Sequence, residues 1–145
     1  MLNRIILASK SRIRKEILDK NNIKSVVEPS NVDEDVVKKS LLKEQVSPEI
    51  ISKNLAELKA NKVSIKKTDE IVLGADSVID LSGELISKPE NREDALSILK
   101  KLNGKSHCLI SSVCFSKNGA MVWNHSDSSE LKMKNLVRAS WKLDF

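Results

Sequence analysis

Apolar and polar positions follow both strand and helix periods along this chain of 145 residues, which predicts one α/β body without internal repeats or long linkers. The stretch 4–8, which is apolar after Arg4, predicts a buried first strand, and residues 25–28 predict a second short strand. Between them, Ile13, Ile17 and Leu18 fall on one face of an expected helix. The chain therefore begins as a strand, a hydroxyl-rich turn and a helix.

The middle of the chain predicts two helices and a hairpin. An amphipathic stretch runs to about Gln45, and Ser47 followed by Pro48 is typical of a helix start. Apolar residues at helical spacing extend that second helix to about Lys66. The next expected elements are a strand over 70–80, a turn at 81–84 and a returning strand over 85–86.

The last third of the chain predicts one helix followed by strands joined by tight turns. The expected elements are a helix capped by Asn91 and running through Leu102, and strands over 106–116, 120–125 and 131–134. Gly104, just past the helix, is typical of a helix end, and Asn118-Gly119 is typical of a hairpin turn.

Asp76 interrupts the apolar run of the expected strand at 70–80, where a core residue is due. A buried carboxylate costs free energy unless it is paired or used in chemistry. Two explanations are open at this point: the acid marks a bulge or a turn, or it performs chemistry at or beside a strand. The neighbours of Asp76 in the fold decide between them.

The turn after the first strand contains Ser9 and Ser11, and basic residues follow at the start of the helix. Free backbone N–H groups at a helix start, together with these cations, favour a bound phosphate. The alternative is that a serine only caps the helix, while the basic residues form its solvated face. The local sequence favours the second explanation slightly.

Three further features carry charge at suggestive places. The acids at 33–35 are either first-turn residues stabilised by the helix dipole, which is the commoner explanation, or groups that help to hold a divalent cation. Lys59 lies beside the apolar seam of the long helix, where a lysine can also extend its amine to solvent. Lys88 follows the predicted hairpin and precedes Pro89.

The composition narrows the function classes. A formal net charge of +5, from 25 basic and 20 acidic residues, favours an anionic ligand weakly and does not require nucleic acid. With no Tyr, two Phe and two Trp, few aromatic side chains can stack on exposed bases. We therefore expect no stable nucleic-acid partner.

Cysteine usage and hydropathy indicate a cytoplasmic protein. Cys108 and Cys114 have no further Cys or clustered His to complete a metal site, and we expect both to be reduced thiols. The apolar run near the N-terminus is too short for a signal peptide or a membrane span, and no later segment reaches a spanning length. No membrane partner is expected.

Six short stretches stand in a specific order along the chain. They are Leu7-Ala8-Ser9-Lys10-Ser11 with Arg14, Asp33-Glu34, Leu55-Ala56 with Lys59-Ala60, Gly74-Ala75-Asp76-Ser77, Lys88-Pro89, and Leu102-Asn103-Gly104 with His107. Each stretch is weak alone, but together they resemble the Maf family, the septum-formation-inhibitor-like nucleoside triphosphate pyrophosphatases. The resemblance extends from Leu2 to about Phe115.

The resemblance implies a Maf/ITPase-like mixed twisted sheet with flanking helices and two lobes around a cleft. It also implies hydrolysis of a ribo- or deoxyribonucleoside triphosphate to the monophosphate and pyrophosphate, with Mg²⁺ or Mn²⁺, as house-cleaning of noncanonical or surplus nucleotides. Asp76 would be the general base and, with Glu34, would lie at the metal. The implied substrate-binding residues are Ser9, Ser11, Arg14, Lys59, Ser77 and Lys88.

The sequence departs from the family pattern in two places. Ile13 replaces the middle residue of a Pro-Arg-Arg stretch, which leaves the preferred base open. The family's later motifs do not occur, and residues 137–145 follow no family pattern. We therefore expect a single Maf-like domain over 1–145 whose second lobe is incomplete, with exposed apolar surface that favours a homodimer or instability.

These departures keep other functions open. One alternative is a Maf-like regulator that binds a nucleotide or a protein without hydrolysis. Another is nucleic-acid binding through the basic N-terminal helix, which predicts an affinity that falls steeply with salt. The retained Asp76, Lys59 and Lys88 favour the enzyme, and the scarcity of aromatic residues makes nucleic-acid binding the least favoured.

Overall fold

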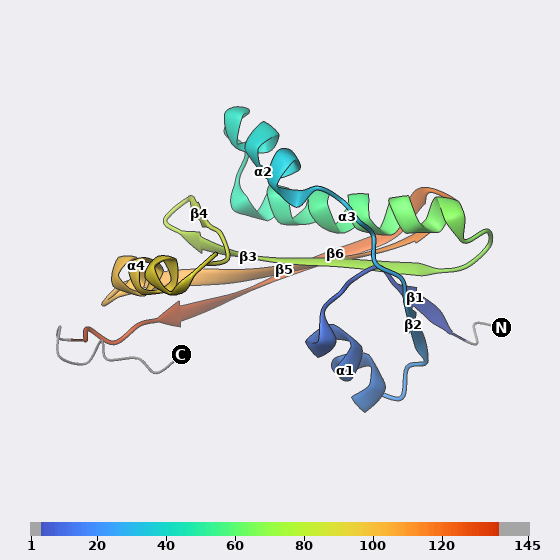
Figure 1. The fold of residues 1–145 in the computed structure, drawn as a ribbon, viewed down its shortest axis with the longest axis horizontal. Helices are drawn as coiled ribbons and strands as arrows, with labels where there is room; N and C mark the ends of the chain where they lie inside the picture. Colours follow the sequence, from blue (N-terminus) through green and yellow to red (C-terminus); the bar gives the residue numbers. More distant parts are fainter. Residues whose placement is uncertain (1–3, 137–145) are drawn as a thin grey trace.

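The computed structural model describes residues 4–136, which form a six-stranded mixed sheet flanked by four helices (Figure 1). The strands are β1 (Ile5–Leu7), β2 (Ser25–Val27), β3 (Val72–Leu81), β4 (Glu84–Ile86), β5 (Ser106–Lys117) and β6 (Ala120–Lys132). The helices are α1 (Arg12–Lys20), α2 (Glu34–Lys43), α3 (Pro48–Lys66) and α4 (Arg92–Leu102). The α/β class with a mixed twisted sheet, predicted from the sequence, is confirmed.

The sheet combines a parallel part and an antiparallel part in the order β2-β1-β3-β5-β6. Strand β1 runs parallel to β2 and to β3, with α1 as the crossover between β1 and β2. Strand β3 is antiparallel to β4 and to β5, and β5 is antiparallel to β6. The carboxyl end of β1 therefore lies beside the beginning of the long strand β3, shortly before Asp76.

Helix α3 packs across β3 and β5 and forms the main core with them (Figure 1). Ala56, Ala60 and Val63 of α3 are buried in one cluster with Ile6 and Val72. The small residues allow a close approach: a Cβ atom added to Gly74 of β3 would lie only 2.1 Å from the carbonyl oxygen of Ala56. The residues of α3 that face β3 are therefore held tightly against that strand.

Each helix begins at a polar cap that the sequence supplies. The side chains of Ser11, Asp33, Ser47 and Asn91 accept hydrogen bonds from backbone N–H groups in the first turns of α1, α2, α3 and α4. The predicted starts of the long helix and of the last helix are confirmed. Of the two serines in the turn after β1, Ser11 caps the helix, as one of the two explanations predicted.

Strand β6 corrects the sequence prediction for the end of the chain. We predicted a strand ending near His125 and a separate strand over 131–134, but β6 is continuous from Ala120 to Lys132. The polar run over 126–129 does not end the strand, because β6 lies at the sheet edge and pairs with β5 along its length. The backbone of an edge strand can pair with its one neighbouring strand while its polar side chains stay solvated.

Several exposed apolar side chains lie outside the core. Ile13 and Ile17, on the predicted apolar face of α1, are 68% and 54% exposed.

Cys108 and Cys114 are free thiols, and Cys114 is buried. Among residues 4–136, no helix is both long and apolar enough to cross a membrane.

Candidate functional site

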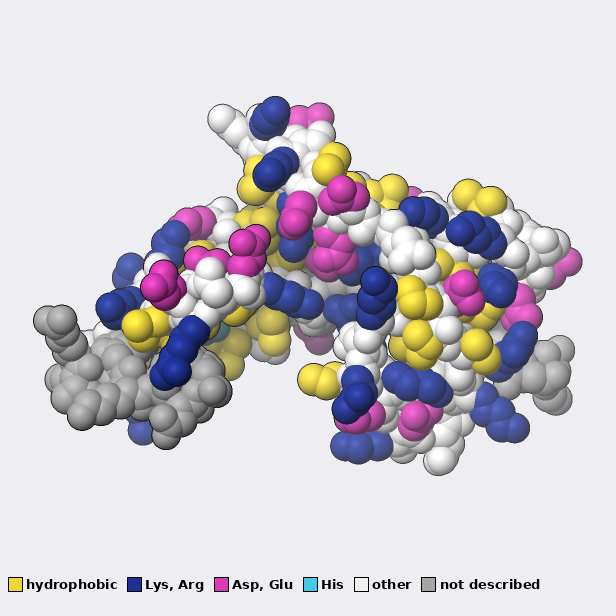
Figure 2. Space-filling model, viewed as in Figure 1, with side chains coloured by type: hydrophobic (Ala, Val, Ile, Leu, Met, Phe, Trp, Pro, Cys, Tyr) yellow, Lys and Arg dark blue, Asp and Glu magenta, His cyan; other side chains and the backbone are white. Residues whose placement is uncertain are grey.

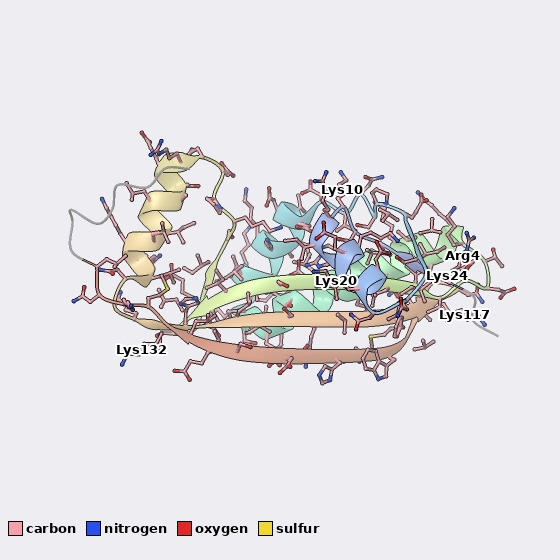
Figure 3. The ribbon with its side chains drawn as sticks, turned by 90° about the horizontal axis from the view of Figure 1, so that it is seen from below. Arg4, Lys10, Lys20, Lys24, Lys117 and Lys132 are labelled. Carbon is pink, nitrogen blue, oxygen red and sulfur yellow. The ribbon has the colours of Figure 1, made fainter. Side chains whose placement is uncertain are left out.

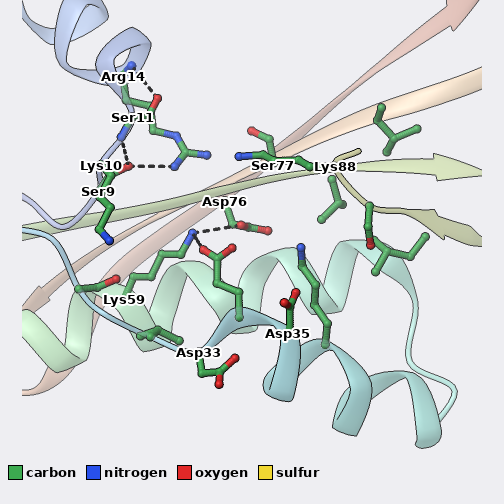
Figure 4. A pocket seen from close by; sticks show the side chains of 18 of the residues that line it. Ser9, Lys10, Ser11, Arg14, Asp33, Asp35, Lys59, Asp76, Ser77 and Lys88 are labelled. Carbon is green, nitrogen blue, oxygen red and sulfur yellow. Dashed lines mark hydrogen bonds and ion pairs between the residues drawn. The ribbon is translucent and has the colours of Figure 1, made fainter. Parts of the chain in front are cut away.

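A pocket of about 850 Å³ lies between the β1–α1 turn, α2, α3, the middle of β3 and the segment after β4 (Figure 4). Its lining includes every site residue predicted from the sequence: Ser9, Ser11, Arg14, Glu34, Lys59, Asp76, Ser77 and Lys88. The structure therefore brings together residues that are up to 79 positions apart in the sequence. Their roles in binding and catalysis stay predictions.

The β1–α1 turn presents hydroxyl and guanidinium groups to the pocket. Ser9 Oγ accepts hydrogen bonds from the backbone N of Ser11 at 3.1 Å and from Nη1 of Arg14 at 3.2 Å. Ser11 Oγ caps α1 by accepting from the backbone N of Arg14 at 3.3 Å. These bonds hold the β1–α1 turn in place. The turn therefore forms one wall of the pocket even though Ser11 also caps α1.

An ion-pair cluster around the buried Lys59 occupies the centre of the site. Nζ of Lys59 lies 2.5 Å from Oε1 of Glu34 and 3.2 Å from Oδ1 of Asp76, and it also donates to the carbonyl oxygen of Ala75 at 3.2 Å. Lys59 and Asp76 are each only 6% exposed. The amine of Lys59 therefore does not extend to solvent, which was the alternative that the sequence left open.

The surrounding strands and helix hold Asp76 in place. Asp76 pairs with Ser112 in an uninterrupted register between β3 and β5, so it marks neither a bulge nor a turn. Ser52 of α3 is fully buried and its hydroxyl donates to the carbonyl oxygen of Asp76 at 3.2 Å. The same hydroxyl lies 2.8 Å from Oγ of Ser112. Asp76 is thus a buried acid on a rigid strand.

The two carboxylates of the cluster have pKa values shifted in opposite directions. Burial raises the pKa of Asp76, and the nearby Glu34 charge adds to this, although Lys59 acts against both. Burial alone would raise the pKa of Glu34, but the hydrogen bond and charge of Lys59, with Lys38 and Lys88, lower it. Glu34 therefore ionises more readily than an ordinary glutamate, and Asp76 holds a proton more readily than an ordinary aspartate.

The carboxylates are chemically suited to a divalent cation that arrives with phosphate. Oδ2 of Asp76 is buried and has no hydrogen-bond partner among residues 4–136, and Glu34 faces Asp76 across Lys59. The same residues contain no cluster of three or more His, Cys, Asp or Glu side chains that would hold a metal ion alone. Mg²⁺ commonly takes one or two carboxylates plus substrate phosphates, and this donor set fits that pattern.

Sequence reasoning missed part of the lining. Lys38 of α2 lines the pocket, one helical turn after Glu34, a spacing that could have revealed it. Lys10 was noted as a basic residue of the turn but not as a site residue. His107, which belongs to one of the six motifs, is buried on β5 and is not part of the lining.

Apolar side chains also line the pocket. They are contributed by β3, β4, α4 and β5, and they include Ile79, Leu85, Ile98 and Leu109. The lining therefore combines cations and carboxylates with apolar groups. This combination suits a ligand that joins a charged group to a flat apolar one.

The sequence profile of the family described as Maf-like protein matches residues 4–142. The chain belongs to the Maf-like protein family. The match covers all the described elements and the complete lining of the pocket. The family assignment implied by the six motifs is therefore confirmed.

Relatives of this Maf-like chain are named as pyrophosphatases. It is 68% identical over 137 residues to the nucleoside triphosphate pyrophosphatase of Pelagibacter ubique, covering 94% of this chain and 70% of the relative. It is 41% identical to the protein of that name from Ruegeria pomeroyi, covering 91% and 66%. It is 33% identical to the 7-methyl-GTP pyrophosphatase of Brucella abortus, covering 94% and 68%. The chain thus spans about two thirds of these relatives' lengths.

Solved structures of Ham1 proteins share the fold. The Ham1 protein of Staphylococcus aureus superposes with a TM-score of 0.57 at 14% identity, over 90% of this chain and 71% of that one. The Ham1 protein of Coxiella burnetii gives a TM-score of 0.54 at 15% identity, over 91% and 73%. At these identities the likeness concerns the fold alone.

Proposed function

We propose that this Maf-like chain is a nucleoside triphosphate pyrophosphatase that hydrolyses a nucleoside triphosphate to the monophosphate and pyrophosphate. The observation that carries the proposal is the contact of the buried Lys59 with both Asp76 and Glu34, at the centre of a pocket lined by further cations. The names of relatives at up to 68% identity support the same reaction. The biological role that fits it is removal of noncanonical or surplus nucleotides.

Asp76 is the proposed general base. Its raised pKa makes it a better proton acceptor than an ordinary aspartate, and its place on β3 holds it rigidly. In the proposed step, a water oxygen forms a bond to the α-phosphorus and the bond from that phosphorus to the leaving pyrophosphate oxygen breaks. The proton lost by the water passes to Asp76.

Cations from separate elements are the proposed triphosphate ligands. Arg14 lies on α1, Lys59 on α3 and Lys88 after β4, so they approach the pocket from different sides (Figure 4). Ser9 and Ser11 add hydroxyl groups. The hydroxyl oxygen of Ser77, a further proposed ligand, lies 3.0 Å from that of Ser111. Preorganised charges aimed at a developing anion lower the barrier more than charges that must move into place.

Mg²⁺ or Mn²⁺ is the proposed cofactor, with Glu34 and Asp76 as its protein ligands. Such an ion neutralises phosphate charge and so favours departure of pyrophosphate. Because Lys59 already contacts both carboxylates, we infer that the ion binds together with the nucleotide. The phosphates would complete the coordination that two carboxylates cannot supply.

Other partners follow from the surface. Positive and negative side chains are interspersed over the face in Figure 2, and Figure 3 shows Lys132 at one end of the molecule with Arg4, Lys24 and Lys117 near the other. Because nucleic acid is bound best by a continuous basic patch, we expect no stable nucleic-acid partner. We also propose a cytoplasmic location, and a homodimer as the arrangement that would cover exposed apolar residues such as Ile13.

Pyrophosphate release from a panel of standard and modified nucleoside triphosphates, with Mg²⁺ or Mn²⁺, tests the proposed reaction. We expect Asp76→Asn to lower kcat by about 10² to 10⁴, because general-base catalysis contributes a factor of that size. Asp127→Asn is the matched control, because Asp127 is exposed on β6 and lies outside the pocket. The panel would also identify the preferred base.

Turnover that Asp76→Asn leaves unchanged would refute the assignment of Asp76. A folded protein that binds a triphosphate but releases no pyrophosphate across the panel would instead favour the non-hydrolysing Maf-like regulator. Calorimetric titration with the same nucleotides separates these two results from a complete loss of nucleotide binding.

A further inference from the structure

Lys38 stands out among the basic residues of α2. It is half-buried and lines the pocket, whereas the adjacent Lys39 is exposed and does not line it. Helix α2 contains no buried residue, so Lys38 is not held in place by a hydrophobic core. Lys38 instead lies on the same face of α2 as Glu34. That face forms one wall of the pocket.

The normal partner of Lys38 is engaged elsewhere. A glutamate four residues before a lysine on a helix usually pairs with it, and Glu34 and Lys38 have this spacing. In the structure Oε1 of Glu34 contacts Lys59 instead. Within residues 4–136, Lys38 forms no ion pair or hydrogen bond, so its ammonium group is free to meet a ligand.

Lys38 decides whether the pocket lining has a net positive charge. Five cationic side chains and four carboxylates line it, and the buried Lys59 is already shared between two of the carboxylates. Lys38 lines the same pocket as Glu34 and Asp76, and its positive charge acts to lower the pKa of both carboxyl groups. Without Lys38, the lining would carry equal numbers of positive and negative groups.

We propose that Lys38 is a triphosphate-binding residue, which lets α2 distinguish the triphosphate substrate from the monophosphate product. The inference rests on the proposed pyrophosphatase function and adds a fourth wall to the phosphate site, beside the β1–α1 turn, α3 and the segment after β4. An unpaired ammonium group gains most from the ligand with the most negative charge. Lys38 therefore favours binding of the triphosphate substrate over binding of the monophosphate product.

The test compares Lys38→Ala with Lys39→Ala, which remove the same charge from neighbouring positions of α2. The ligands are the α,β-methylene analogue of the best substrate in the pyrophosphate-release panel and the corresponding monophosphate, with dissociation constants measured by calorimetric titration. We expect Lys38→Ala to weaken the analogue roughly 10- to 100-fold, the range for a hydrogen bond to a charged group, and to weaken the monophosphate less. Lys39→Ala should match the unmodified chain.

Kinetics and a conservative variant separate ligand binding from a structural role. Lys38→Ala should raise KM for the triphosphate with kcat nearly unchanged, and Lys38→Arg should restore most of the affinity. Equal behaviour of Lys38→Ala and Lys39→Ala, in an unmodified chain that releases pyrophosphate, would overturn this inference alone. Absence of both turnover and analogue binding in the unmodified chain would overturn the proposed function and the inference with it.

Discussion

Nζ of Lys59 lies 3.2 Å from Oδ1 of Asp76, and both side chains are almost completely buried. The two residues come from α3 and β3, which pack closely because Gly74 has no side chain to separate them. A lone buried charge would be costly, but this contact lets a cation and an acid share one low-dielectric site. The pKa of Asp76 is nevertheless raised, because burial outweighs the attraction to Lys59.

Replacement of Lys59 should move the pH dependence of the reaction. Asp76 must be deprotonated to act as the base, so kcat/KM should rise with pH through the pKa of Asp76. The positive charge of Lys59 lowers that pKa. Lys59→Met should therefore shift the acidic limb of the residual kcat/KM to higher pH.

A profile of kcat/KM against pH checks this shift, with Lys53→Met as the control. Lys53 lies on the same helix but is exposed, and its contact is with Glu49 at 4.0 Å rather than with the pocket. An acidic limb at the same pH in Lys59→Met and in the unmodified chain would show that Asp76 does not control the profile.

Asp76→Asn should stabilise the fold at neutral pH. Because the folded-state pKa of Asp76 is raised from 3.8, ionisation costs more in the folded chain than in the unfolded chain. At a pH above the raised pKa the unmodified chain bears this cost, and a neutral Asn does not. Below 3.8 Asp76 is protonated in both states, so the advantage of Asn should disappear.

Urea unfolding at a series of pH values measures this effect. The midpoint of Asp76→Asn should exceed that of the unmodified chain at pH 7, and the difference should shrink as the pH falls through the pKa of Asp76. The exposed Asp127→Asn should show no comparable trend. A difference that grows toward acidic pH would mean that ionised Asp76 stabilises the fold.

The helices were largely predictable because their signals are local. The Ser47-Pro48 start and the apolar spacing up to Lys66 define α3 without any tertiary information. The depth of Lys59 on that helix was not predictable, because a lysine beside an apolar seam can be buried or solvated. What decides it is the close contact at Gly74 and the position of Asp76 on another element.

The sheet and the pocket lining show the same limit. The sequence predicted a strand end near His125, yet β6 continues because β5 supplies a pairing partner along its length. The contact of Ser52 with the backbone of Asp76 and with Ser112 also depends on three elements meeting. Motif order located the site residues, but only the fold shows which charges are paired and which, like that of Lys38, are not.

Glu34→Gln should weaken the binding of the divalent metal that the reaction requires. The lowered pKa of Glu34 keeps it ionised, and together with Asp76 it is a proposed ligand of Mg²⁺ or Mn²⁺. A neutral amide is a poorer ligand for a hard cation, so we expect the metal concentration for half-maximal activity to rise about tenfold or more. Chelation with EDTA should abolish the activity of the unmodified chain.

Titration of pyrophosphate release with MgCl₂ measures this change, with Glu28→Gln as the control. Glu28 contacts Lys67 at 3.8 Å and lies outside the pocket. Identical metal titrations for Glu34→Gln and Glu28→Gln would remove Glu34 from the proposed metal site, while the assignment of Asp76 would remain.

Gly74→Ala should destabilise the fold and disturb the site together. The added Cβ would lie 2.1 Å from the carbonyl oxygen of Ala56 and 2.8 Å from the backbone N of Ala60, and these backbone atoms cannot move without shifting α3. Overpacking of a core typically costs about 1 to 3 kcal/mol, and a backbone clash of this kind should reach the upper end. Lys59, on the same turns of α3, would then lose its position beside Asp76.

Gly83→Ala is the matched control for this glycine. Gly83 has a φ of +92° but nothing within 4 Å of an added Cβ, so only backbone strain of about 1 kcal/mol is expected. Urea unfolding should rank Gly74→Ala well below Gly83→Ala in stability, and only Gly74→Ala should also lose pyrophosphate release under conditions where it remains folded. If both variants kept full activity and equal stability, the close packing of α3 on β3 could not be what positions Lys59.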